Sequence, residues 1–230
     1  YLYVLTMDGT LHVYDEYRKN DSPIASLDGF DSPSELVFVG DKAYVADNLS
    51  GIHVLDMSNP TNPTRITTFS GDGGAQDIAT DGQYLYVAAG SLGIEVFSIE
   101  ALEKVSSLSY GSAIVAVDVS DGLLWATNHE DVVVVDVADP ENPLPLAMEK
   151  TPEWSLNVVG VGNTAFVGDW SEMRHYTLED VAAPEADPSS SELYFYLGSA
   201  ERTFEMANRG SEVLEINGFG IFWSTSESPA

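Results

Sequence analysis

KAYVADNLSGIHVLDMSNPTNP, residues 42–63, contains two short β runs joined by a turn and followed by a segment rich in Pro and Asn. The first run, Tyr44 to Ala46, is aromatic and β-branched, which suits a half-buried pleated surface. Residues 47–51 have turn chemistry, because Gly51 reaches positive φ without steric cost. Residues 52–56 form the second β run, which alternates apolar and polar side chains at its start. Two Asn-Pro pairs then end the strand pairing, because Pro has no N–H to donate.

Copies of this unit recur along most of the chain. Each copy carries an aromatic marker in its first run, and the markers recur every 39 to 42 residues, at Tyr3, Tyr44, Tyr86, Trp125 and Phe166. A β run with a tight turn precedes the later copies, and a further β run follows most of them, so one period holds four strands. A period of about 40 residues built from four strands is typical of propeller blades.

We therefore expect an all-β fold, a β-propeller of four-stranded blades that is complete or partial. The first copy starts in mid-blade, without an innermost strand. Its start, and the lack of an initiator Met or signal peptide, indicate a piece of a longer protein. The alternating pattern around the markers predicts that four of them occupy equivalent buried positions between sheets: Tyr44, Tyr86, Trp125 and Phe166.

Two copies resemble a known family. Residues 44–63 and 132–143 share an apolar strand that ends in Asp, followed by an Asn-Pro or Asp-Pro pair and a second Asn-Pro pair. This pattern is similar to that of LVIVD-repeat β-propellers of bacterial secreted and surface proteins. The resemblance implies LVIVD-type blades over residues 1–181 and a role as a binding or scaffold module, since the family has no common catalytic motif.

The C-terminal part has a different composition. Residues 182–191 form a linker rich in Pro and Ser, and residues 192–230 contain runs that alternate as strands do. Residues 203–216 resemble the first half of immunoglobulin-like domains of the Hydin and choice-of-anchor D type. About 40 residues are fewer than the roughly 100 of a complete sandwich. We expect a partial immunoglobulin-like β module, with an extension of the last blade as the alternative.

Charge and composition exclude some classes of function. The chain has 37 acidic and 9 basic residues and a formal net charge of −28. Nucleic acids and anionic membranes bind through basic patches, so neither is expected as a partner. Because the chain has no Cys, disulfides, thiol catalysis and Cys-ligated metals are excluded. The acidic surface is interpreted either as solubilising or as cation-binding.

The sequence contains none of the catalytic or nucleotide-binding fingerprints that we sought. In a propeller, the turns between second and third strands share a face with the loops that enter the next blade. This face is expected to collect polar and aromatic side chains suited to binding a protein or a surface glycan. The predicted binding residues are Asp47, Asn128, His129, Asp169, Trp170 and Trp154.

Oxygen ligands from several of these loops also suit Ca²⁺. The candidate calcium residues are Asp31, Asp72, Glu130 and Glu172, although solvated turns account for the same residue types. Trp170 is interpreted either as an exposed anchor or as a side chain that folds back onto the last blade or the tail.

The functional hypothesis is a non-enzymatic binding or scaffold module of a secreted, cell-surface or periplasmic bacterial protein, within a larger polypeptide or assembly. Two alternatives stay open: a metal-assisted hydrolase or lyase with its site on the same loop face, and a structural spacer in an extracellular assembly. No catalytic residue is assigned, and no membrane insertion is expected.

Overall fold

The computed structural model describes residues 1–15 and 22–178 of the 230-residue chain. These residues form 18 β-strands, and they all belong to the first of two compact units, Tyr1–Ser199. Within them there is no helix long and apolar enough to cross a membrane. The expected linker at 182–191 and the expected immunoglobulin-like module at 192–230 lie outside the described residues.

The strands form five antiparallel sheets, in each of which neighbours in space are neighbours in sequence; we call them blades 1 to 5. Blade 1 contains β1 (Leu2–Thr6), β2 (Thr10–Tyr14) and β3 (Ala25–Asp28). Blade 2 contains β4 (Pro33–Val39), β5 (Lys42–Asp47), β6 (Gly51–Asp56) and β7 (Thr64–Phe69). Blade 3 contains β8 (Asp77–Thr80), β9 (Tyr84–Ala88), β10 (Ile94–Ser98) and β11 (Glu103–Leu108). Blade 4 contains β12 (Ala116–Ser120), β13 (Leu123–Thr127), β14 (Asp131–Asp136) and β15 (Leu144–Lys150). Blade 5 contains β16 (Ser155–Val161), β17 (Thr164–Asp169) and β18 (Met173–Thr177).

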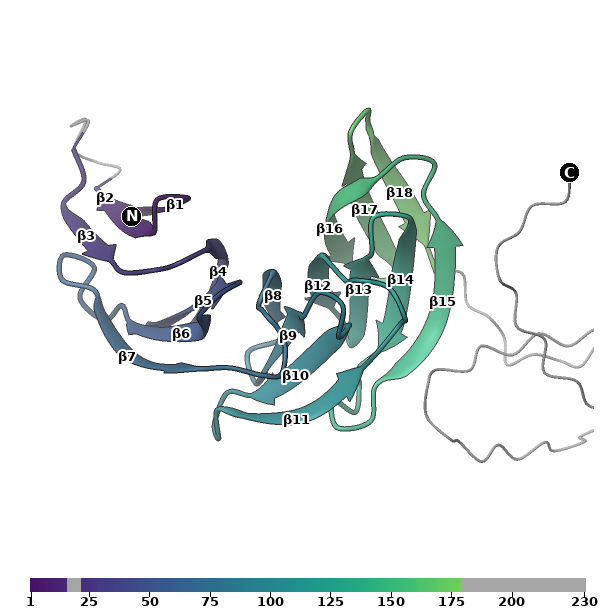
Figure 1. The fold of residues 1–230 in the computed structure, drawn as a ribbon, viewed down its shortest axis with the longest axis horizontal. Coiled ribbons are helices and arrows are strands. Elements are labelled where there is room, and N and C mark those ends of the chain that lie inside the picture. Colours follow the sequence, from purple (N-terminus) through teal and green to yellow (C-terminus); the bar gives the residue numbers. More distant parts are fainter. Residues whose placement is uncertain (16–21, 179–230) are drawn as a thin grey trace, which may run out of the picture. The chain divides into compact units, whose positions relative to one another are not determined.

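Consecutive blades meet through their first strands. In Figure 1, β4, β8, β12 and β16 follow one another, and each contacts the next. Blade 1 starts at the position of a second strand, and its β1 contacts β4. Four-stranded antiparallel sheets that follow one another through their first strands are the organisation of a β-propeller. The predicted all-β repeat architecture is therefore confirmed.

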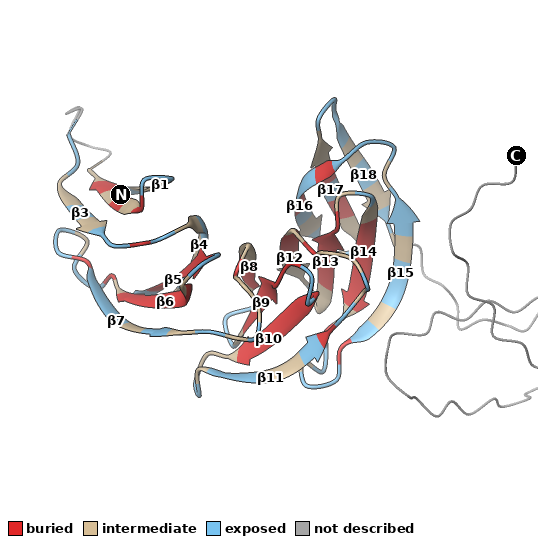
Figure 2. Ribbon diagram, viewed as in Figure 1, coloured by how far each residue is buried: buried red, intermediate tan, exposed pale blue. Residues whose placement is uncertain are grey.

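The hydrophobic core lies between the blades. Each cluster of buried side chains combines residues from two consecutive blades, and in blades 2, 3 and 4 the second and third strands are the most deeply buried (Figure 2). Between blades 3 and 4, for example, Tyr86 and Ile94 share a cluster with Val117 and Leu124. Such burial contributes roughly 25 cal/mol per Å² of apolar surface removed from water. A blade is therefore stabilised mainly by its neighbours.

The marker aromatics follow this arrangement with one exception. Tyr44 and Tyr86 are 0% exposed and Trp125 is 2% exposed, as predicted. The prediction is wrong for Phe166, which is 41% exposed. Each buried marker packs on the blade that follows it; no described sheet follows blade 5, so no described blade covers Phe166 in this way.

Trp125 shows how closely the blades approach. Its ring lies against Gly160 of β16, where an added Cβ would stand 2.6 Å from a ring carbon. The indole N–H also donates a hydrogen bond to the carbonyl of Gly162, at 3.3 Å. A larger residue at position 160 would displace the ring, so glycine is required there for blades 4 and 5 to meet.

The fourth strands of blades 2, 3 and 4 share an irregularity. Each pairing with the third strand shifts register by one residue, directly after Val54, Val96 and Val134. In the pairing of the third strand with the second, the same valines lie opposite the markers Tyr44, Tyr86 and Trp125. A bulge at this point increases the local twist and leaves one residue of the outer strand unpaired.

Two carboxylates on the first strands also join the blades. Asp77 of β8 accepts a hydrogen bond from the backbone N–H of Val117 in blade 4, at 2.9 Å. Asp118 of β12 likewise accepts one from the N–H of Gly160 in blade 5, at 2.7 Å. Burial raises the pKa of Asp77 to about 7; the bonds from Val117 and Ile78 oppose this shift, and the charges of Glu35 and Asp118 add to it.

We predict that Tyr86→Ala lowers the free energy of unfolding by about 3–5 kcal/mol, because it removes a large buried ring between blades 3 and 4. The matched variant Phe166→Ala should cost about 1 kcal/mol or less, because this ring is partly in solvent. Denaturant unfolding of both variants measures the difference. Equal losses would contradict the assignment of the core to the blade boundaries.

We also predict that Asp77→Asn reduces the pH dependence of stability. The pKa of Asp77 is about 7 in the folded state and 3.8 ordinarily, so between pH 3.8 and about pH 7 the folded protein binds more protons than the unfolded chain. Its contribution to stability is therefore complete below about pH 4 and is lost as the pH rises through about 7. Unfolding at about pH 5 and pH 8 should differ less in the variant than in the wild type. Asp118→Asn alters the corresponding contact between blades 4 and 5, and it is the control for the effect of changing an inter-blade hydrogen bond.

Candidate functional site

Three of the predicted binding residues hold turns in place. Asp47 and Asp169 end second strands and Asn128 directly follows one, and the Oδ1 atom of each accepts hydrogen bonds from the backbone of the following turn. Asp47 Oδ1 accepts from the N–H groups of Leu49 and Ser50, both at 3.0 Å. The equivalent donors are Glu130 and Asp131 for Asn128, and Ser171 and Glu172 for Asp169. These oxygens accept hydrogen bonds from the protein's own backbone and so hold the turns in shape.

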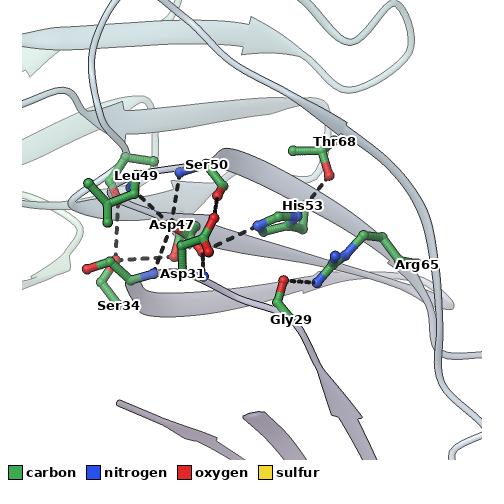
Figure 3. A network of polar contacts seen from close by, with 12 residues as sticks. Gly29, Asp31, Ser34, Asp47, Leu49, Ser50, His53, Arg65 and Thr68 are labelled. Atoms are coloured by element: carbon green, nitrogen blue, oxygen red, sulfur yellow. Dashed lines mark hydrogen bonds and ion pairs between the residues drawn. The ribbon is translucent and has the colours of Figure 1, made fainter. Parts of the chain in front are cut away.

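Asp47 belongs to a wider polar network in blade 2 (Figure 3). It is fully buried and also accepts hydrogen bonds from the N–H groups of Asp31 and Ser32, at 2.7 and 3.1 Å. Burial alone would raise the pKa of Asp47, but the four backbone donors outweigh it and lower the pKa. The network therefore fastens the loop that enters blade 2 to the turn of the same blade.

His53 connects Asp47 to the outer strand of the blade. Its Nε2 lies 3.4 Å from Asp47 Oδ2, and its Nδ1 lies 2.8 Å from the Thr68 hydroxyl (Figure 3). Burial lowers the pKa of His53, and the charge of Arg65 acts in the same direction. Arg65 in turn donates to the Gly29 carbonyl at 2.8 Å and lies over the Phe30 ring. The order Asp, His and Thr suits a proton relay, but neither hollow described below borders Thr68.

The candidate calcium residues are used in separate contacts. Asp31 accepts a hydrogen bond from the Ser50 hydroxyl. Asp72 forms an ion pair with Lys104, whose ammonium also lies 2.9 Å from the buried carboxylate of Glu95. Glu172 forms an ion pair with Arg174. The structure does not bring Asp31, Asp72, Glu130 and Glu172 together, and nowhere in residues 1–15 and 22–178 do three or more His or acidic side chains form a group that could hold a metal ion.

His129 and Trp154 lie together where blade 4 meets the entry to blade 5. Their rings stack with centroids 5.0 Å apart and planes 20° apart, and Trp154 is 57% exposed. His129 has a φ of 78°, a conformation that is uncommon outside glycine and is often found at functional sites. The Ser155 N–H donates to the His129 carbonyl at 2.8 Å, which ties this turn to blade 5. We call the stacked pair the aromatic ledge.

Two hollows adjoin each other at this place. The smaller, of about 200 Å³, is bordered by the aromatic ledge and by Glu130, Thr151 and Glu153. The larger, of about 450 Å³, lies between β15 and β18, and Lys150 and Pro152 border both. The sequence identified His129, Trp154, Glu130 and Glu172 as site residues, but it did not identify the other lining residues: Glu149, Lys150, Thr151, Pro152, Glu153, Met173, Arg174, His175 and Tyr176.

Trp170 follows the turn residue Asp169 and is 72% exposed, so it does not fold back onto the described part of blade 5. The neighbouring Asp169 lies 3.2 Å from the Arg174 guanidinium. The backbone N–H groups of Glu172 and Ser171, with help from Arg174, hold the pKa of Asp169 at about 2. Trp170 thus extends from a turn that its own backbone and an ion pair hold firmly.

We predict that Asp47→Ala lowers the free energy of unfolding by about 3 kcal/mol or more, since it leaves several buried N–H groups without an acceptor. Asp31→Ala is the matched control, because Asp31 is exposed and contributes one side-chain contact. Its loss should be about 1 kcal/mol or less. Thermal melts of both variants at neutral pH measure the effect. An unchanged stability of the Asp47→Ala variant would show that the network does not support the turn.

The comparisons with known proteins concern the fold. No curated protein matches the chain. A crystal structure of the mitotic checkpoint complex contains a chain with 13% identity and a TM-score of 0.65, covering 76% of this chain and 58% of its own length. The computationally designed Ika8 protein has 15% identity and a TM-score of 0.62, covering 76% of this chain and 55% of its own length. The present chain thus spans little more than half of either matching chain, and at such identity the likeness establishes only a propeller-like fold. The model of the family described as domain of unknown function DUF5074 matches residues 1–148, and the chain belongs to that family.

Proposed function

We propose that this protein is a non-catalytic binding module whose recognition surface is centred on the aromatic ledge of His129 and Trp154. Trp170 is a second anchor on blade 5. In this proposal the remaining blades act as a scaffold that fixes the position of the turns. The partner is a protein or a surface glycan.

The exposed stacked pair is the observation that carries this proposal. Trp154 keeps more than half of its surface in solvent, although it lies on a turn with fixed backbone contacts. Large aromatic side chains held rigidly beside a hollow supply contact area at low cost in conformational entropy, and they dominate binding energies at interfaces. The adjoining hollow of about 200 Å³ gives a ligand group room beside the indole.

The polar residues favour binding over catalysis. Asp47, His53 and Thr68 form the closest approach to a catalytic arrangement, but Asp47 is occupied by four backbone donors. The acidic side chains near the ledge instead suit polar or basic groups of a ligand. A net charge of −28 also disfavours nucleic acid as the partner.

The finer assignments follow from the sequence. We propose that the blades are of the LVIVD type and that residues 192–230 start an immunoglobulin-like module of the same larger polypeptide. The LVIVD resemblance is to secreted and surface proteins of bacteria, so we propose a secreted, cell-surface or periplasmic location.

We predict that Trp154→Ala weakens binding by at least about ten-fold without changing the melting temperature, because the ring anchors a ligand and not the core. Binding is measured by applying the labelled full chain to an array of glycans and to an array of extracellular protein domains. Leu49→Ala is the control, since Leu49 is a large apolar side chain that is 76% exposed on the turn of blade 2 that corresponds to the His129 turn of blade 4.

Two results would overturn the proposal. One is unchanged binding in both Trp154→Ala and Trp170→Ala, which would place the recognition surface elsewhere. The other is a large fall in melting temperature with binding intact, which would make the ledge a structural element.

A further inference from the structure

Among the strands that the structure describes, blade 5 differs from the complete blades at its outer edge. In blades 2, 3 and 4 the third strand pairs on both sides, with the second strand and with a fourth. Within the part of the chain that the structure describes, β18 pairs with β17 alone. An unpaired edge presents backbone donors and acceptors that a further strand can use.

The antiparallel register identifies the groups at this edge. The Asp169 N–H donates a hydrogen bond to the Glu172 carbonyl, and the Leu178 N–H donates one to the Asn163 carbonyl. Because hydrogen-bonded and non-bonded pairs alternate in such a ladder, Arg174 and Tyr176 point their backbone groups toward β17. The N–H and C=O groups of Met173, His175 and Thr177 therefore point to the outer edge.

The larger hollow follows this edge. It is lined by five consecutive residues, Glu172 to Tyr176, and on the other side by Glu149 and Lys150 of β15. Successive side chains of a strand point to opposite faces of the sheet. A hollow lined by consecutive residues of β18 borders the strand on both of its alternating sets of side chains, which fits a position along the edge of β18. Its volume of about 450 Å³ gives an added strand room to enter.

The sequence directly after β18 is a poor source of the fourth strand. In blades 2 to 4 the fourth strand begins no more than eight positions after the third strand ends. The corresponding stretch here, AAPEADPSSS at 182–191, has two Pro and no β-branched or aromatic residue. Such a composition disfavours strand pairing.

We propose that the edge of β18 is a docking site for an extended strand of a partner polypeptide, which pairs antiparallel with β18 and completes blade 5. The fourth strands of blades 2 to 4 indicate its chemistry. Each fourth strand pairs a small residue with the valine that precedes the register shift: Thr67, Ser106 and Ala147. Each also carries one basic residue: Arg65, Lys104 and Lys150. The hollow along this edge adjoins the one beside the aromatic ledge, but the docking proposal does not depend on the function of the ledge.

A peptide with the sequence of residues 62–71, NPTRITTFSG, is the probe, because it contains β7. Fluorescence anisotropy of the labelled peptide with the full chain should give saturable binding. Amide hydrogen exchange should then slow at Met173, His175 and Thr177 but change little at Arg174 and Tyr176, which are already paired. The same peptide with Thr67→Pro should not bind, because proline cannot donate to a ladder.

A pair of variants at one position separates backbone pairing from side-chain contact. His175 corresponds to Val54, Val96 and Val134 in the complete blades, each of which lies opposite its blade's marker aromatic. His175→Val keeps the backbone N–H and should retain binding. His175→Pro removes the N–H at an edge where proline is tolerated, and it should weaken binding at least about ten-fold. Equal far-ultraviolet circular dichroism and melting temperatures check that both variants fold.

Three results would overturn the proposal. If the Met173, His175 and Thr177 amides exchange slowly before peptide is added, and the chain is a monomer, its own residues cover the edge. If they are slow and sedimentation shows a dimer, a second copy covers it. Peptide binding that is equal in His175→Pro and His175→Val would show that β18 does not pair with the peptide. None of these results bears on Trp154, so the binding proposal is tested separately.

Discussion

The contact between the faces of consecutive blades is the interaction on which the rest of this structure depends. A blade standing alone would expose the apolar side chains of its faces to water, at a cost of roughly 25 cal/mol per Å² of apolar surface. Here every core cluster is shared by two blades, and the marker aromatic of one blade is covered by the next. The exposure of Phe166 in blade 5 shows what the same residue does without that cover.

Polar interactions refine this packing without replacing it. The Asp77 and Asp118 carboxylates reach from one blade to backbone groups of the next. The network around Asp47 and His53 fastens an entering loop to its own blade. Both devices satisfy backbone donors that would otherwise be buried without a partner, which would cost about 1–3 kcal/mol each. Because these groups are already satisfied, the exposed aromatic side chains are left as the features best suited to meeting a ligand.

The repeat made much of the fold predictable from the sequence. A regular spacing of aromatic markers with four β runs per period led to the sheets, their strand order and three of the four buried markers. The position of His129 and Trp154 on one loop face was also predictable, since both follow from blade geometry. Their stacking was not, because it depends on the left-handed backbone of His129 and on the hydrogen bonds that hold it.

Other features of the site could not be read from residue types. Asp and Asn at the ends of second strands suit a ligand and a turn equally well, and only the coordinates show that Asp47, Asn128 and Asp169 bind their own backbone. The groove between β15 and β18 joins strands of different blades that are more than twenty residues apart in sequence. No local motif marks such a groove.

The bulges on the outer strands also bear on how copies of this protein behave in concentrated solution. Ile66, Val105 and Leu146 are the unpaired extra residues of β7, β11 and β15, and they interrupt the regular spacing of each outer edge. Growth of stacked sheets needs flat edges that match over their whole length, and a twisted edge with charged side chains resists it. The pairing of β18 with β17 has no such shift. Among the strands that the structure describes, β18 is therefore the edge at which edge-to-edge aggregation is expected to start, and an irregularity protects the outer edges of blades 2, 3 and 4.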